Sequence, residues 1–155
     1  MNVILHILIT TSLALIQDCP VKGIPKTPDG KSDIGGALID GFNGREYSIH
    51  HVCDRGTHKL LLQRLIGSLD DGQPIWETRA EMQIPVGKKK YTIAYGLNSC
   101  RQQGQFNSRL IGLIDWTQNK EYPRAIKVWL VDLEREHFME IKATDVECEN
   151  VSYGI

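Results

Sequence analysis

The sequence lacks an excess of charge of either sign. Its 155 residues carry 18 lysines and arginines against 19 aspartates and glutamates, which leaves a formal net charge of −1 at pH 7. Proteins that bind nucleic acids neutralise the phosphates with a basic face. The composition therefore gives no electrostatic reason to expect a nucleic acid as partner.

The motifs that carry the common chemistries are missing too. The sequence contains no GxSxG nucleophile turn, no HExxH zinc helix, no P-loop and no GxGxxG dinucleotide fingerprint. No cofactor is therefore expected, and the residues favour a non-catalytic protein over an enzyme.

Long apolar runs are absent beyond the N-terminus. Residues 1–16 carry no lysine, arginine, aspartate or glutamate, and their apolar run of ~14 residues is shorter than the ~20 that a membrane span needs. This length is typical of a secretory signal, and Ser12-Leu13-Ala14 offers the small residues of a cleavage site. We therefore expect residues 1–14 to be a signal peptide and the mature chain to be periplasmic or secreted, without membrane insertion. Because Met1-Asn2 lacks a basic residue, a buried N-terminal strand or helix is the alternative.

The four cysteines lie at positions 19, 53, 100 and 148, and no two of them form a CxxC pair. That spacing argues against a thioredoxin-like site and against a zinc site of four thiolates. All four follow the expected cleavage site, and an even number in an exported chain indicates two disulfides. Of the three possible pairings we favour Cys19–Cys53 with Cys100–Cys148, because these would hold the N-terminal segment and the tail.

No stretch shows a convincing amphipathic helix, whereas several alternate with the period of two that is typical of strands. The clearest alternation runs over residues 75–84, and a continuous apolar segment runs from Leu110 to Trp116. About seven or eight such segments follow one another between short turns. The pattern predicts an all-β fold, either an antiparallel sandwich or an up-and-down barrel. Residues 45–155 form its single domain, after a Pro/Gly-rich extended lead-in over residues 15–44.

A polar segment without a clear period, residues 101–109, is the preferred candidate for binding. It combines amide side chains with one aromatic ring and flanking arginines, and loops on a rigid scaffold commonly carry binding sites. The residues expected to contact a partner are Arg101, Gln102, Gln103, Gln105, Phe106 and Asn107. The sequence thus suggests a small exported protein that presents a loop to a protein or another macromolecule, in the manner of an inhibitor or immunity factor.

Two other functions remain open at this stage. A small-molecule carrier would need a closed barrel with an apolar interior. A metal-dependent enzyme would use the histidines at 50, 51 and 58, since a turn at residues 54–57 would bring His58 near His51 and Cys53. Oxidation of Cys53 in an exported chain argues against that site, and no metal is expected.

Overall fold

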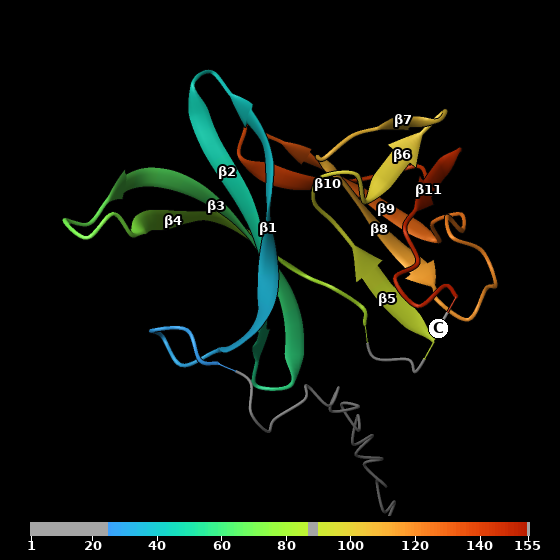
Figure 1. The fold of residues 1–155 in the computed structure, drawn as a ribbon, viewed down its shortest axis with the longest axis horizontal. Coiled ribbons are helices and arrows are strands. Elements are labelled where there is room, and N and C mark those ends of the chain that lie inside the picture. The colour runs from blue at the N-terminus through green and yellow to red at the C-terminus, as the bar shows by residue number, and fades with distance from the viewer. Residues whose placement is uncertain (1–24, 87–89, 155) are drawn as a thin grey trace, which may run out of the picture.

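The computed structural model describes residues 25–86 and 90–154, which form eleven antiparallel strands in three sheets and no helix (Figure 1). Sheet A has the order β1 (Ser32–Phe42), β2 (Arg45–Asp54), β3 (Thr57–Ser68), β4 (Pro74–Gln83). Sheet B has the order β10 (His137–Ile141), β9 (Lys127–Asp132), β8 (Leu110–Asp115), β5 (Tyr91–Ala94). Sheet C has the order β11 (Val146–Cys148), β6 (Cys100–Gln102), β7 (Gln105–Phe106).

The predicted all-β class is confirmed, and the packed sheets are compatible with a sandwich. The count of seven or eight strands is too low, because β6, β7 and β11 are each only two or three residues long. Strands this short contain too few residues to show a period of two. Within the described residues, no helix is long and apolar enough to cross a membrane. The expected signal peptide, residues 1–14, lies outside the described residues.

Sheet B is the middle layer, with an apolar core on each of its faces. Toward sheet A, Ile111 of β8 and Val131 of β9 pack with residues of β2 and β3 such as Ile49 and Leu62. Toward sheet C, Leu110 and its neighbours pack around the residues of β6 and β11. That second core contains Ala94, Cys100, Leu110, Ile114, Ala125, Val128, Val146 and Cys148. Because β8 is covered on both faces, its apolar residues are continuous instead of alternating.

Strand β1 begins well before the expected domain boundary at Arg45. Residues 32–42 pair along β2 from Ser32 opposite Cys53 to Phe42 opposite Arg45, with irregularities after Asp33 and after Ile39. The glycines that suggested a lead-in are accommodated by an irregularity between Asp33 and Gly35, where Gly35 has a φ of 142°. The lead-in expected over residues 15–44 therefore includes a complete edge strand of sheet A; residues 15–24 lie outside the described part.

A carboxylate at the junction of sheets A and B accepts several hydrogen bonds. Glu136, in the β9–β10 turn, accepts hydrogen bonds from the Tyr47 hydroxyl and Arg64 Nη1, both at 2.9 Å. Arg79 Nε donates to the same carboxylate, and both guanidinium groups also contact Glu77. Burial alone would raise the pKa of Glu136, but the hydrogen bonds and the arginine charges outweigh it and lower that pKa. The network ties three strands of sheet A to one turn of sheet B.

The predicted Cys100–Cys148 disulfide is present. The two cysteines face each other directly across β6 and β11, with their Cα atoms 4.1 Å apart. Both side chains are fully buried against β8, so the crosslink is a part of the second core. Cys53 is also disulfide-bonded, whereas Cys19, its predicted partner, lies outside the described residues.

Asn150 holds the connection between β8 and β9 in place. Its side chain is 3% exposed, and its Nδ2 donates to the carbonyl oxygens of Trp116 and Gln118, both at 3.0 Å, and of Lys120 at 3.3 Å. Its Oδ1 accepts from the Ser152 backbone at 3.2 Å. The amide therefore satisfies carbonyl groups of a segment that has no strand of its own.

Replacing Asn150 with aspartate should lower the free energy of unfolding by about 2–3 kcal/mol. Aspartate has the same shape but has no donor at neutral pH, so the three carbonyls would lose their partner and face a negative charge. Urea unfolding of Asn150→Asp measures the loss. The exposed neighbour Val151 gives the control, because Val151→Ala should change stability by less than about 0.5 kcal/mol. Equal stabilities for the two variants would contradict this assignment.

Candidate functional site

The segment expected to be a loop is a tight hairpin of β6 and β7. Arg101 pairs with Phe106 and Gln102 with Gln105, across a two-residue turn at Gln103-Gly104. Both turn residues have positive φ, 51° and 80°, as a type I′ turn requires. Glycine takes this conformation easily, but glutamine at the first position gives no strong sequence signal for it.

The base of this hairpin is held by three interactions. The Cys100–Cys148 disulfide joins β6 to β11. Arg101 bonds Glu147 of β11 through two nitrogens, Nε at 3.0 Å and Nη2 at 2.9 Å. Its guanidinium carbon also lies 4.2 Å from the centre of the Tyr122 ring. Arg101, expected to contact a partner, thus has a clear role inside the molecule: it fixes the hairpin to its surroundings.

The outer part of the hairpin, in contrast, is exposed. The side chains of Gln102, Gln103 and Gln105 are exposed and make no hydrogen bond with any described residue. Phe106 is 46% exposed, with its ring centre 5.9 Å from that of Tyr122. Asn107 has a local role, since its Oδ1 accepts from the Arg109 backbone at 3.0 Å. The predicted residues thus divide into exposed groups, the three glutamines and Phe106, and groups with a structural role, Arg101 and Asn107.

A polar cleft of about 750 Å³ lies between the hairpin and the end of β1. Asp40 and Phe42 of β1 line one side, and Arg109 and the hairpin amides line the other. Ser108 joins the two sides: its hydroxyl donates to Asp40 Oδ2 at 2.6 Å and accepts from the Asp40 backbone at 2.9 Å. Sequence reasoning missed the β1 side, because 68 positions separate the two residues and β1 was not expected to be a strand.

The histidines expected for the metal-dependent alternative do not converge. His51 and His58 meet, with Nε2 of the first 3.0 Å from Nδ1 of the second. His50 lies on the opposite face of β2, where its Nε2 is 2.8 Å from Asp33 Oδ1. Cys53, opposite His58 in the ladder, is disulfide-bonded. Among the described residues no group of three or more His, Cys, Asp or Glu side chains is arranged to hold a metal.

The two paired histidines are held in their neutral forms. Burial, with smaller contributions from the neighbouring His58 and His50, lowers the pKa of His51 from 6.5 to about 4. Burial also lowers the pKa of His58. One ring therefore donates its N–H to the other, and neither has a charge to offer a ligand at neutral pH.

This pair makes the fold sensitive to acid. In the unfolded chain a histidine takes up its proton near pH 6.5, whereas His51 in the folded protein does so only near pH 4. The unfolded state binds more protons in that window, so stability is complete above pH 6.5 and falls as the pH approaches 4. Between pH 7.5 and 5 the expected loss is about 2 kcal/mol. His51→Gln, which cannot titrate, should show a correspondingly smaller loss in urea unfolding; an unchanged pH dependence would contradict the account.

The described site offers recognition groups instead of reactive ones: free amides, an exposed ring and a pair of opposite charges across an open cleft. The hydroxyl that is bonded to a carboxylate there, Ser108 with Asp40, is only 4% exposed and joins β1 to the segment after the hairpin. Nothing beyond this geometry assigns a role, because no protein family, curated protein or solved structure matches the chain.

Proposed function

We propose that the protein is a small exported, non-catalytic binding protein that presents its β6–β7 hairpin to a macromolecular partner. The hairpin tip and the adjoining polar cleft form the contact surface. Phe106 is the apolar anchor, and the glutamines at 102, 103 and 105 supply adaptable donors and acceptors.

The observation that carries this proposal is the contrast between the two ends of the hairpin. Its base is fixed by a disulfide, an ion pair and a ring contact, whereas the amides at its tip have no partner among the described residues. A rigid mount reduces the entropy lost when the exposed groups bind. A partly exposed aromatic anchor surrounded by adaptable polar groups is also the chemistry of efficient protein-binding surfaces.

The expected compartment agrees with this proposal. A disulfide buried in a core persists in an oxidising environment, and such bonds are rare in a reducing cytosol. Export would place the hairpin among periplasmic or extracellular macromolecules, and the signal-like residues 1–14 would direct it there.

The test compares capture by variants of the mature protein, residues 15–155, immobilised in oxidised form. Extract from the native compartment is passed over each variant, and the main bound species is quantified by mass spectrometry. Phe106→Ala should recover at least about tenfold less of it, because anchor residues contribute about 2 kcal/mol or more. Leu69→Ala is the matched control: Leu69 is an apolar side chain of similar exposure, 53%, in the β3–β4 turn. Equal capture by wild type and Phe106→Ala would overturn the proposal.

A further inference from the structure

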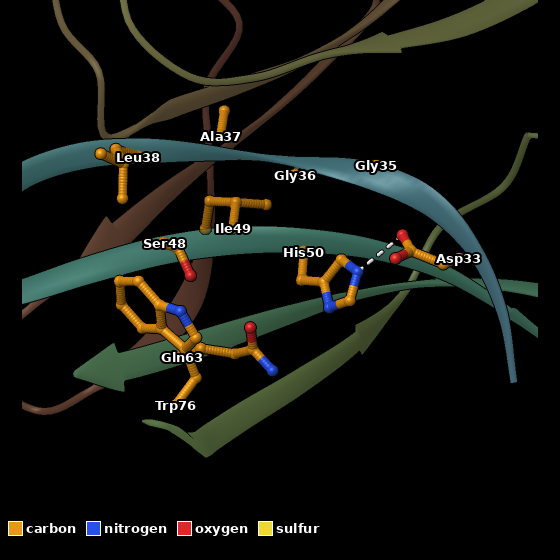
Figure 2. A pocket seen from close by; sticks show the side chains of 10 residues that line it. All are labelled: Asp33, Gly35, Gly36, Ala37, Leu38, Ser48, Ile49, His50, Gln63 and Trp76. Atoms are coloured by element: carbon orange, nitrogen blue, oxygen red, sulfur yellow. Dashed lines mark hydrogen bonds and ion pairs between the residues drawn. The ribbon is translucent and has the colours of Figure 1, made fainter. Parts of the chain in front are cut away.

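A second groove lies on the outer face of sheet A, away from the hairpin. Its volume is about 340 Å³, and residues of all four strands line it. Figure 2 shows its side chains: Asp33 and Leu38 come from β1, Ser48 and His50 from β2, Gln63 from β3 and Trp76 from β4. Its size is at the lower end for sites that hold a small molecule.

The groove exists because β1 has no side chain opposite His50. Gly36 occupies that register position. A Cβ there would lie 3.1 Å from the Ile49 carbonyl oxygen and 3.6 Å from His50 Cδ2, so a larger residue would both press on β2 and fill the space. The imidazole and the strand beside it therefore stay accessible from the outer face.

Three polar side chains along the groove can form hydrogen bonds with a ligand. The bond from His50 Nε2 to Asp33 Oδ1, 2.8 Å long, fixes the orientation of the imidazole, and the other ring nitrogen points away from Asp33 (Figure 2). The Ser48 hydroxyl and the Gln63 amide make no side-chain hydrogen bond with any described residue. Together these groups can both donate to and accept from hydroxyls.

Two large apolar side chains, Trp76 and Leu38, line the groove beside its polar groups. Trp76 supplies a large ring beside Gln63 and Ser48 (Figure 2), and Leu38, which is 55% exposed, lies beside Ser48 across β1 and β2. A side chain such as Trp76 offers a flat apolar face to a ligand. The groove thus presents one apolar wall next to a row of hydrogen-bonding groups.

The charges of the described lining residues favour an uncharged ligand over an ionic one. Among the residues that the structure describes, neither lysine nor arginine lines the groove, and the one carboxylate there, Asp33, is already bonded to His50. The matching ligand is uncharged, with one apolar face and several hydroxyls around its edge. We propose that this groove binds a sugar ring of a neutral glycan, stacked on Trp76 and hydrogen-bonded by Ser48, Gln63 and His50. This site is independent of the hairpin, so either assignment can fail without the other.

The test is an NMR titration of the oxidised mature protein, with cellotriose, maltotriose and triacetylchitotriose as probes. At least one of these neutral trisaccharides should shift the Trp76 indole resonance and the Gln63 side-chain amide saturably, with dissociation constants in the millimolar range. Adenosine tests a planar heterocycle in place of a sugar. Saturable shifts of the same groups by adenosine alone, or by none of the four probes, would overturn the proposal.

Variants assign the binding to the groove. Trp76→Ala should lower the affinity for the tightest-binding trisaccharide at least tenfold. Gly36→Val, whose side chain would fill the groove, should lower it to the same extent. Trp116→Ala is the matched control, because Trp116 is a tryptophan of 39% exposure in the β8–β9 connection and does not line the groove. Amide spectra of the free variants establish that each is folded. Unchanged affinity in a folded Trp76→Ala protein, or shifts confined to the β6–β7 hairpin, would overturn the assignment.

Discussion

Removing the Cys100–Cys148 disulfide should lower the free energy of unfolding by about 4 kcal/mol. The bond joins residues 48 positions apart, and a crosslink over such a span removes much of the conformational freedom of the unfolded chain. The Cys100→Ala, Cys148→Ala double variant also leaves a space next to β8, since both sulfurs are buried in the second core. Urea unfolding extrapolated to zero denaturant measures the difference, and the slope should rise because the unfolded chain without the crosslink exposes more surface.

The same double variant should loosen the hairpin more than the rest of the molecule. Amide hydrogen exchange in β6, β7 and β11 should become faster than exchange through global unfolding, whereas β2 and β3, at the centre of sheet A, should keep their relative protection. A loss of stability below about 1 kcal/mol, or uniform acceleration in all sheets, would contradict the role given to this bond.

Gly112→Ala should destabilise the protein by at least about 3 kcal/mol. Gly112 sits in the middle of β8 directly beneath the disulfide, and a Cβ at this position would lie 2.2 Å from Cys148 Sγ and 3.2 Å from Cys100 Sγ. Neither the central strand nor the crosslinked pair can move aside easily. Thermal and urea unfolding give the change in stability.

Two comparisons separate this clash from a general effect of the substitution. In the background without the disulfide, where both sulfur atoms are absent, Gly112→Ala should cost at least about 1.5 kcal/mol less than in the wild type. Gly67→Ala, at a strand glycine with open space around its Cβ position, should change stability by less than about 0.5 kcal/mol. If the cost of Gly112→Ala were the same with and without the disulfide, the sulfurs would not be its cause.

The parts of the fold that the sequence predicts are those where one physical constraint dominates. Residues 75–84 form β4 as their alternation predicts, but an irregularity opposite Leu62 and Gln63 divides it: Ala80 and Met82 pack on the core, whereas Trp76 faces the outer side of sheet A. The apolar run from Leu110 was recognisable as a buried segment, but its cause, a sheet covered on both faces, needs the third sheet to be known. Strand β1 was missed because its glycines disfavour strands locally, and pairing with β2 overrides that preference.

The candidate site was predictable only in part for a related reason. The hairpin segment stood out by its amides and its aromatic ring, which are local properties. The partners that turn it into a site lie far along the chain. Glu147 is 46 positions from Arg101, and Tyr122 is 16 from Phe106. Asp40 is 68 positions from Ser108, which follows the hairpin, and only the fold brings these residues together. The different roles of Arg101, which is fixed by its contacts, and Phe106, the exposed residue opposite it, follow from those contacts.

The most direct test of the central claim is photo-cross-linking from the tip of the hairpin. A photoreactive phenylalanine analogue replaces Gln103 in the tip, and in a second protein it replaces Asp71 in the exposed β3–β4 turn. Irradiation in extract from the native compartment should give one discrete adduct from position 103 that unlabelled wild-type protein suppresses and unlabelled Phe106→Ala does not. No competable adduct from position 103, or the same adduct from both positions, would contradict a partner-binding role for the β6–β7 hairpin.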